Sequence, residues 1–309
     1  MVLAGERPEW LKIIPKRNER FNNLSHLFQS LNLHTVCEEA HCPNIYECWN
    51  QGTATLMLLG DVCSRACRFC MVRPGKPNGI VDPFEPEHVA YALSKMNLNY
   101  VVLTSVDRDD LPDGGASHFA RTIRKVRESC PELMIEVLIP DFQNDVDALK
   151  LVVDAKPDVI SHNVETTLSL TPRVRDPRAG YWQSLSVLRN VKKLDRTIYT
   201  KSSIMLGLGE SDEEVQQTML HLRNAEVDFL TLGQYLRPSR RHLEIKEYVR
   251  PERFSYFREL GLEMGFKYVA SGPLVRSSYR AGEFFIRSIV KEARNADTFT
   301  YLERRNIEK

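Results

Sequence analysis

The sequence has no surplus of charge of either sign, because its 42 lysines and arginines balance 41 aspartates and glutamates and leave a net charge of +1. This balance argues against a broad basic face for a nucleic acid backbone, although it is compatible with a small local patch. No apolar run approaches the roughly 18–20 residues that a membrane helix needs. The N-terminus lacks the apolar core of a secretory signal, and an arginine- and serine-rich transit segment is missing as well. These absences predict a cytoplasmic protein whose partners include neither a nucleic acid nor a membrane.

Internal repeats, low-complexity tracts and flexible linkers are also missing, but cysteine is unevenly distributed. Six of the seven cysteines fall between positions 37 and 70, and the seventh is Cys130. In a long intracellular chain, such crowding indicates metal or redox ligands rather than disulfides. Cys130 stands beside Pro131 at the expected end of a helix, and we interpret it as a structural residue.

From about Thr55, short apolar strands alternate with amphipathic helices, which predicts right-handed βαβ units and a parallel sheet. Six units over about 215 residues favour a partial (β/α)6 barrel over a complete eight-unit barrel, which usually takes about 250 residues. A doubly wound open sheet is the alternative, but cysteines stand where its dinucleotide fingerprint would follow the first strand. In either fold the chemistry belongs at the carboxyl ends of the strands. Strands are expected at 55–60, 100–105, 134–139, 158–162, 198–206 and 229–233, with 267–270 as a candidate seventh, and helices at 87–96, 117–128, 145–154, 181–193, 212–225 and 251–264.

We divide the chain into an N-terminal extension (1–54), the barrel (55–275) and a C-terminal extension (276–309). The N-terminal extension is irregular and polar apart from one expected helix between Arg20 and Leu33, whose apolar residues share a face. This extension carries the first cysteine group. We expect it to need the rest of the protein, and a metal, to stay ordered.

The second cysteine group reads C-S-R-A-C-R-F-C at positions 63–70, directly after the first expected strand. Three thiolates on one loop suit a soft metal centre, either zinc or an iron–sulfur cluster. A structural zinc site takes four protein ligands, usually as two separated pairs. Three cysteines on a tight loop instead hold three irons of a [4Fe–4S] cluster and leave the fourth iron open, which is a catalytic arrangement.

This C-x3-C-x2-C spacing, with Phe69 directly before the third cysteine, resembles the signature of the radical S-adenosylmethionine (radical SAM) superfamily. The resemblance implies that Cys63, Cys67 and Cys70 hold a catalytic cluster whose open iron is chelated by the amino and carboxylate groups of S-adenosylmethionine. The first group has a C-x4-C-x5-C spacing and contains Cys37, Cys42 and Cys48. Three buried structural cysteines are the alternative there, but beside the second triad a second cluster is favoured.

Further segments are similar to those of the lipoyl synthase family. Cys37 to Trp49 resembles its auxiliary-cluster motif, and R-S-S-Y-R-A-G at 276–282 resembles its R-S-S-Y-x-A-G motif. The similarity runs from about Trp10 to about Phe284 with no motif departure. It also includes T-S-V-D-R-D-D-L-P-D-G-G at 104–115, H-N-V-E-T-T at 162–167, M-L-G-L-G-E at 205–210 and G-Q-Y-L-R-P-S at 233–239.

The resemblance implies insertion of two sulfur atoms at C6 and C8 of an octanoyl chain carried on a lysine of a lipoyl-carrier protein domain. Those carbons carry no acidic proton, so general acid–base catalysis has nothing to act on and homolytic hydrogen abstraction is needed. The auxiliary [4Fe–4S] cluster would be sacrificed as the sulfur source, with Ser278 as its fourth ligand and Ser277 as the second candidate. An electron donor such as ferredoxin or flavodoxin and an iron–sulfur carrier that rebuilds the cluster are the other implied partners.

Contacts to S-adenosylmethionine are expected at the strand ends. Gly114 and Gly115 are candidates for its methionine end, although a Gly-Gly pair is also typical of a simple turn. Inward-facing polar groups of the fourth and fifth strands are candidates for its ribose and carboxylate, with Arg178 as a second candidate for the carboxylate. The full expected set is Phe69, Thr104, Ser105, Gly114, Gly115, Asn163, Glu165, Arg178, Lys201 and Gln234, with Ser202 beside Lys201.

Two other functions stay open at this point. One is another sulfur-inserting radical SAM enzyme that acts on a small molecule or on tRNA, although a tRNA enzyme would be expected to show an RNA-binding domain and a basic surplus. The other, from a different class, is a non-catalytic protein with two structural zinc sites. The basic loop 237–242 is either a carrier-docking loop or a solvated one. His41 and His162 lie near the chemistry in sequence, but packing roles fit them equally well.

Overall fold

Parallel strands form the centre of the molecule in the computed structural model, which describes residues 7–12, 18–39, 42, 44–50, 55–96 and 98–278. The main sheet has eight strands whose order in space follows their order in the chain. The first strand pairs antiparallel with its neighbour, and every later pair is parallel. The strands are β1 (His34–Thr35), β2 (Thr55–Leu58), β5 (Tyr100–Ser105), β6 (Met134–Leu138), β7 (Val159–Ser161), β8 (Tyr199–Leu206), β9 (Phe229–Gln234) and β10 (Tyr268–Gly272).

The sheet is a curved, incomplete barrel, because its two end strands, β1 and β10, do not pair within the described residues. The expected partial barrel of parallel strands is therefore confirmed, and the candidate seventh strand at 267–270 is its last parallel member. The antiparallel β1 was not expected. It adds two residues of the N-terminal extension to the edge of β2.

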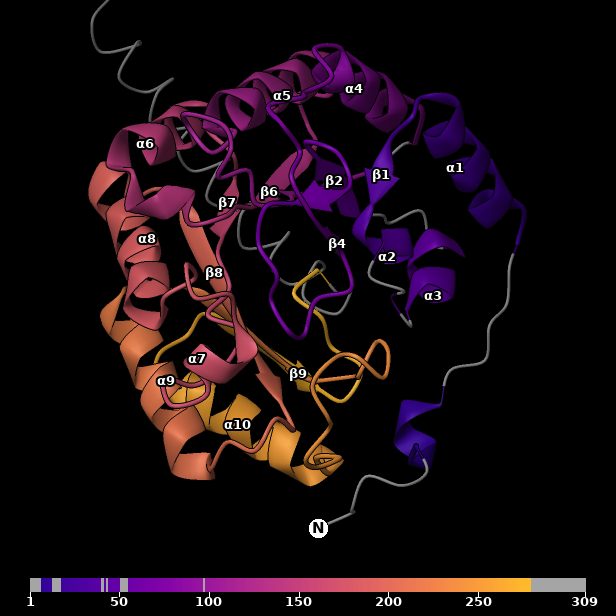
Figure 1. The fold of residues 1–309 in the computed structure, drawn as a ribbon. Coiled ribbons are helices and arrows are strands. Elements are labelled where there is room, and N and C mark those ends of the chain that lie inside the picture. Colours follow the sequence, from indigo (N-terminus) through magenta and orange to yellow (C-terminus); the bar gives the residue numbers. More distant parts are fainter. Residues whose placement is uncertain are drawn as a thin grey trace, which may run out of the picture.

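Helices surround the strands in a ring. The longer helices that follow β2 succeed one another around the outside of the sheet (Figure 1). Sequence signals set their ends: Asp145 caps α6, Ser211 and Glu214 form a capping box on α9, and Pro251 begins α10. The observed bounds agree with the expected ones to within two residues. The helices are α4 (Glu85–Met96), α5 (Ala116–Ser129), α6 (Val146–Asp154), α8 (Tyr181–Leu194), α9 (Asp212–Asn224) and α10 (Pro251–Glu263).

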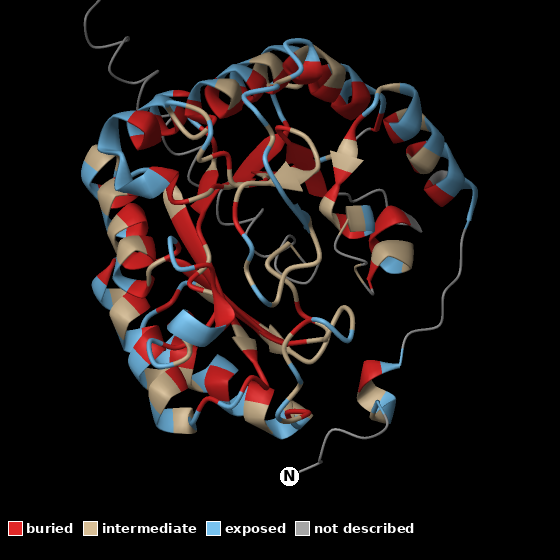
Figure 2. Cartoon of the chain, in the orientation of Figure 1, coloured by how far each residue is buried: buried red, intermediate tan, exposed pale blue. Residues whose placement is uncertain are grey.

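Burial follows this layered arrangement, with the strands buried and the helices exposed on their outer sides (Figure 2). All four residues of β2 are buried, as is typical of a parallel sheet covered on both faces. The inner face of α5 contributes Phe119, Ile123 and Val126, none of which is exposed to solvent. The apolar layer between helices and strands thus fixes the strand ends that build the site.

The N-terminal extension packs directly onto the barrel. Its helix α1 (Glu19–Ser30) begins after Asn18, which accepts a hydrogen bond from the Phe21 amide at 2.9 Å. Phe21 and Phe28 contact Trp49, with ring centroids 4.8 and 5.6 Å apart, in the same apolar core as β2 and α4. Trp49 belongs to α3 (Ile45–Asn50), and the short α2 (Val36–Glu39) precedes it. The first cysteine group is therefore held against the barrel by aromatic packing.

Some expectations lie outside the described residues. Of the C-terminal extension 276–309, the structure describes only 276–278, so Tyr279 to Gly282 of the arginine–serine motif are not described, and neither is His41. The division at residues 54 and 275 stays a prediction. None of the helices in the described ranges is long and apolar enough to cross a membrane.

Candidate active site

A cavity of about 840 Å³ opens at the carboxyl ends of the strands. This volume is in the range of sites that enclose a cofactor or a small ligand. Its walls come from the N-terminal extension, the cysteine loop, the strand ends and the last described segment. Of the expected site residues, it is lined by Cys37, Cys42, Cys63, Cys67, Phe69, Cys70, Thr104, Ser105, Asn163, Glu165, Gln234, Ser277 and Ser278.

Backbone hydrogen bonds hold the cysteine loop, residues 63–70, in place from several sides. The Ser64 amide donates to the Asp107 carbonyl at 2.9 Å, and the Arg68 amide donates to the Val174 carbonyl at 3.0 Å. His242 adds a side-chain bond of 3.0 Å between its Nε2 and the Cys70 carbonyl. Loops that follow β5, β7 and β9 therefore all fix this loop.

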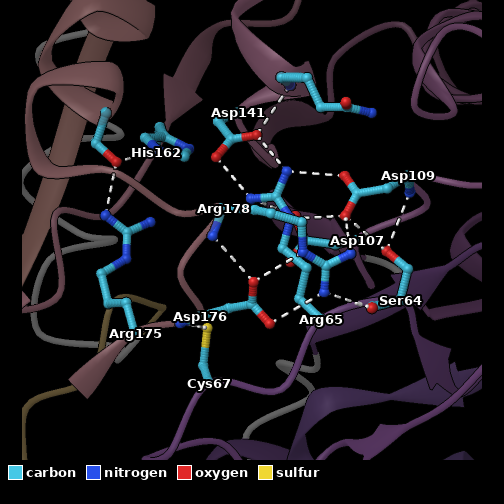
Figure 3. Close-up of polar contacts among 12 residues, drawn as sticks. Ser64, Arg65, Cys67, Asp107, Asp109, Asp141, His162, Arg175, Asp176 and Arg178 are labelled. Carbon is cyan, nitrogen blue, oxygen red and sulfur yellow. Dashed lines mark hydrogen bonds and ion pairs between the residues drawn. The ribbon is translucent and has the colours of Figure 1, made fainter. Parts of the chain in front are cut away.

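Arg65 forms the centre of a buried charge network beneath the same loop (Figure 3). Its guanidinium is 2% exposed and donates to Asp141 at 2.6 and 2.7 Å and to Asp109 at 2.8 and 2.9 Å. Asp107 approaches it to 3.5 Å. Because a planar guanidinium matches two carboxylates geometrically, this arrangement orients Arg65 between the ends of β5 and β6.

Arg178 belongs to this network rather than to the cavity, where it was expected. It donates to Asp176 at 2.9 Å, to Asp109 at 3.1 Å and to the Ser64 carbonyl at 2.8 Å. Asp176 in turn accepts a hydrogen bond from the Ala66 amide at 2.8 Å. The Arg178 guanidinium holds the pKa of Asp176 well below its usual range. These bonds clamp the outer side of the cysteine loop.

Burial makes the three thiols of the loop poor acids. It raises the pKa of Cys63 and Cys70 to about 12 and that of Cys67 to about 11. Two backbone amides oppose this effect, since Arg65 N–H donates to Cys63 Sγ at 3.4 Å and Asp176 N–H donates to Cys67 Sγ at 3.3 Å. Thiolates here need a cationic centre to compensate for burial.

His162 is a fully buried neutral imidazole that supports the network from the next strand. Its Nδ1 donates to the Ile139 carbonyl at 2.9 Å, so its Nε2 accepts the Ser184 hydroxyl at 2.9 Å. Arg175 donates to that same hydroxyl at 2.7 Å. Burial, reinforced by the Arg175 charge, lowers the pKa of His162 to about 4. The residue thus positions loops, consistent with a packing role.

The first cysteine group lies across the cavity in an apolar setting. Cys37 and Cys48 are buried with Trp49 in the core, and Cys42 is half-buried between them. Burial raises the pKa of Cys37 to about 12 and raises that of Cys42 as well. No described carboxylate–arginine clamp surrounds this group, in contrast to the loop at 63–70.

The end of the described chain returns to this first group. Asn44 donates to the Leu274 carbonyl at 2.7 Å, and Thr55 donates to the Ser278 hydroxyl at 2.9 Å. The return path runs over Gly233, where a Cβ atom would lie 2.0 Å from the Val275 carbonyl oxygen. Only glycine allows this close approach. Ser278 and Ser277 are thereby brought to the same cavity as Cys37, Cys42 and the loop at 63–70, whereas Cys48 does not line it.

The strand-end residues differ in whether their polar atoms already have hydrogen-bond partners. Ser105 Oγ and Asn163 Oδ1 line the cavity, are buried and have no hydrogen-bond partner among the described residues. Thr104 donates to the Leu138 carbonyl, while the Gln234 amide is bonded to backbone groups of β8 and of the loop that follows β9. Burial raises the pKa of Glu165, whose carboxyl accepts from Asn163 at 3.1 Å. Ser105 and Asn163 are therefore the candidates with free capacity for a ligand.

Besides Arg178, three expected cofactor contacts do not line the cavity in the described structure. Gly114 and Gly115 form the turn before α5 with φ values of 60° and 90°, and a Cβ at Gly115 would lie 2.3 Å from Leu59. Lys201 lies in the first half of β8 and is ion-paired with Glu136 at 2.9 Å, far from the strand's carboxyl end. Its neighbour Ser202 is also buried away from the cavity and accepts a bond from the Val164 amide. The two glycines are therefore explained by the geometry of the turn, and Lys201 is explained by its internal ion pair.

The three cysteines of the loop at 63–70 suit an iron–sulfur cluster. In the described part of the chain, no three His, Cys, Asp or Glu side chains lie close enough together to hold one metal ion. A structural zinc ion needs four such groups that converge on one point. The thiolates of a [4Fe–4S] cluster bind different irons, so they need not converge.

Comparison with known proteins decides the family. The Radical SAM superfamily model matches residues 57–222, more than half of the chain. The chain is 55% identical over 282 residues to the lipoyl synthase of Thermus thermophilus, covering 91% of this chain and 87% of the relative. It is 52% identical over 301 residues to the mitochondrial lipoyl synthase of Homo sapiens, covering 95% and 81%. The chain belongs to the lipoyl synthase family.

Solved structures of other radical SAM enzymes share the fold of this lipoyl synthase family member. Methylornithine synthase (PylB) aligns with a TM-score of 0.52 at 14% identity, over 83% of this chain and 79% of that one. The hydrogenase maturase HydG from Carboxydothermus hydrogenoformans aligns with a TM-score of 0.53 at 13% identity, over 75% and 65%. At such low identity these likenesses speak for the fold alone.

Sequence reasoning missed several residues that build the site of this radical SAM protein. Arg65 lies between Cys63 and Cys67 in the sequence. Asp107 and Asp109 follow the end of β5, and polar residues at strand ends are a known sign of an active site in such folds. Asp141 follows the end of β6 and carried the same signal, whereas Asp176 gave no comparable one. Thr55 was assigned only to the first strand, although its hydroxyl reaches Ser278.

Proposed function

We propose that the chain inserts two sulfur atoms, at C6 and C8, into an octanoyl group carried on a lysine of a lipoyl-carrier protein domain. The observation that carries this proposal is that Cys37 and Cys42 of the first group, the three cysteines of the loop at 63–70 and the Ser277–Ser278 pair line one cavity, although they lie far apart in the sequence. A single cluster would suffice to start a radical. A second set of ligands in the same cavity suits a second cluster that is consumed as the sulfur substrate.

Cys63, Cys67 and Cys70 would hold the catalytic [4Fe–4S] cluster, and S-adenosylmethionine would bind its open iron. Together these groups supply a 5′-deoxyadenosyl radical, which neither acid nor base side chains can replace. The unpaired Ser105 and Asn163 groups would bind S-adenosylmethionine, with Phe69 beside it. The Arg65 network would keep the loop fixed through repeated turnovers.

Cys37, Cys42, Cys48 and Ser278 would hold the auxiliary cluster, which would act as a substrate because its sulfide would enter the product. A serine oxygen is a less matched ligand for such a cluster than a thiolate. It therefore suits a position that must open when sulfide leaves. The apolar surroundings of this group would also keep water away from the carbon radical.

The octanoyl-lysine arm of the carrier would enter beside a set of exposed arginines. Arg68, in the loop at 63–70, and Arg241, in the loop at 237–242, line the cavity and are exposed. Arg240 is exposed beside Arg241. None of these three arginines forms an ion pair with a described residue. We infer that this arginine rim, Arg68 with Arg240 and Arg241, faces an acidic surface of the carrier. A ferredoxin- or flavodoxin-like electron donor and an iron–sulfur carrier are the other proposed partners.

The cytoplasmic location stays a prediction. Relatives named for the chloroplast, the apicoplast and the mitochondrion are about as similar to this chain as the bacterial relatives are.

The test is anaerobic reconstitution with iron and sulfide, followed by incubation with S-adenosylmethionine, a strong reductant and an octanoyl-lysine peptide. Mass spectrometry of the peptide and chromatography of the nucleoside products are the measurements. We expect two added sulfurs together with 5′-deoxyadenosine. Release of 5′-deoxyadenosine without sulfur insertion would keep the radical chemistry and overturn the substrate. If neither product forms and the reconstituted chain holds no iron, the proposal as a whole fails.

A further inference from the structure

Thr55 lies where the N-terminal extension, with the first cysteine group, meets the barrel, with the second. It is the first residue of β2, so it joins the N-terminal extension to the barrel. Its side chain is 5% exposed and lines the cavity. The register pairs it with Val102 of β5, which fixes its backbone in the parallel sheet. A residue held in this way can position its neighbours with little freedom of its own.

Thr55 contacts two of the proposed ligands of the auxiliary cluster at once. Its hydroxyl donates to Ser278 Oγ at 2.9 Å, across 223 positions of sequence. Its backbone lies close enough to Cys37 to lower the pKa of that thiol, although burial dominates and raises it. No other described residue hydrogen-bonds to the Ser278 hydroxyl. One threonine therefore places a ligand from the start of the chain next to a ligand from its far end.

The direction of the bond matters for the chemistry of Ser278. A serine oxygen has two lone pairs, and Thr55 uses one of them by donating. The second lone pair is left for another partner, and Ser278 lines the same cavity as Cys37 and Cys42.

We propose that Thr55 is the positioning residue of the auxiliary site: it holds Ser278 beside Cys37 as a pre-oriented, easily released fourth ligand. This inference rests on the proposed role of Ser278 as a cluster ligand. Groups that orient metal ligands commonly change metal affinity by about 10–100-fold when removed. The same range is expected for Thr55.

The variants separate positioning from simple packing. Thr55→Val keeps the shape of the side chain and removes the hydroxyl, whereas Thr55→Ser keeps the hydroxyl. Thr122 is the matched control, because it is also buried and donates a hydrogen bond of the same 2.9 Å length to the His118 carbonyl on α5. Thr122→Val therefore removes a comparable bond far from the cavity.

The experiment uses the full chain with Cys63, Cys67 and Cys70 replaced by alanine, so that only the auxiliary site binds iron. After anaerobic loading, iron and sulfide per chain are measured, followed by the rate at which a chelator removes the iron. We expect Thr55→Val to lose iron about 10–100-fold faster than the parent. Thr55→Ser and Thr122→Val should stay within about twofold of it.

A second readout needs no metal. Hydrogen exchange of the 270–278 peptide in the unloaded chain should be faster in Thr55→Val than in Thr122→Val, because the segment loses its anchor. Equal iron loss and equal exchange in these two variants would overturn the positioning role. Ser278→Ala is the separate check: if it also leaves iron retention unchanged, the proposed ligand role of Ser278 fails along with the inference. Faster iron loss in Ser278→Ala, with a rate in Thr55→Val equal to that of the parent, would overturn the inference alone.

Discussion

The two cysteine groups face one cavity but are built in opposite ways. The loop at 63–70 is short, tied by backbone bonds to several strand ends, and clamped by a buried arginine between two aspartates. The group at 37–48 is spread over α2 and α3, rests on aromatic packing, and receives Ser278 from the far end of the described chain. One site has a stiff polar support, and the other has an apolar wall and a single hydrogen bond to a serine.

This difference matches different demands on the two proposed clusters. A cluster that passes electrons repeatedly needs ligands that do not move, and the charge network around Arg65 supplies that stiffness. A cluster that gives up sulfide needs ligands that let go and allow rebuilding. Buried ion networks are costly to break, whereas one neutral hydrogen bond contributes only about 0.5–1.5 kcal/mol.

The largest effects should come from the cysteines themselves. Cys63→Ala should abolish cleavage of S-adenosylmethionine, because the open-iron cluster loses a ligand. Cys37→Ala should leave that cleavage measurable and abolish sulfur insertion. Parallel assays of 5′-deoxyadenosine and of thiolated peptide check both statements. If the two variants show the same pattern, the two groups do not have separate roles.

The next largest effect should come from removing Arg65, the centre of the buried charge network. Arg65→Ala leaves Asp141 buried without its partner, and breaking a buried pair costs about 3–5 kcal/mol. We expect a lower unfolding midpoint and loss of about half of the bound iron. Arg178→Ala is the matched control, because its side chain is 50% exposed and should cost about 1 kcal/mol or less. Equal losses in both variants would contradict a central role for Arg65.

The residues of this network show how far the sequence could lead. Element bounds were predicted well, because apolar periodicity and caps are local signals. Arg65 and Asp141 lie 76 positions apart, and Thr55 and Ser278 lie 223 apart, so no local pattern joins them. Lys201 was expected at the cofactor because inward-facing polar groups of the fifth strand were candidates for its ribose and carboxylate. Its ion pair with Glu136, which is 65 positions away, could not be read from any local pattern.

The Arg65 network and its neighbour His162 should also make the stability of this part of the site sensitive to acid. His162 has an ordinary pKa of 6.5, lowered to about 4 in the folded chain, so the unfolded chain binds more protons between these values. Stability conferred by the neutral imidazole is therefore present above pH 6.5 and is lost as pH falls toward 4. Between pH 7 and pH 5 this amounts to about 2 kcal/mol.

Unfolding midpoints of the parent and of His162→Gln at both pH values measure this term. The parent should lose more stability on acidification than the variant does. A variant with an unchanged pH dependence would show that His162 is not the group responsible.

The smallest effect should come from the arginine rim. Arg240→Glu with Arg241→Glu should raise KM for an octanoylated carrier domain by about 5–10-fold at low salt, since exposed charge pairs contribute up to about 1 kcal/mol each. KM for an octanoyl-lysine peptide should not change. Arg124→Glu with Arg189→Glu, both exposed on the outer helices α5 and α8, is the matched control. An equal change with the peptide would place these arginines in the cavity chemistry instead of carrier docking.

The contrast between a retained and a consumed cluster is tested most directly by a single turnover with ³⁴S. The chain is loaded anaerobically with ³⁴S-labelled clusters, freed of excess sulfide, and given octanoyl-lysine peptide, S-adenosylmethionine and reductant. We predict a product with two ³⁴S atoms, about one product per chain, and an intact cluster at Cys63, Cys67 and Cys70 afterwards. Product with unlabelled sulfur, or loss of the barrel cluster in place of the auxiliary one, would contradict the account.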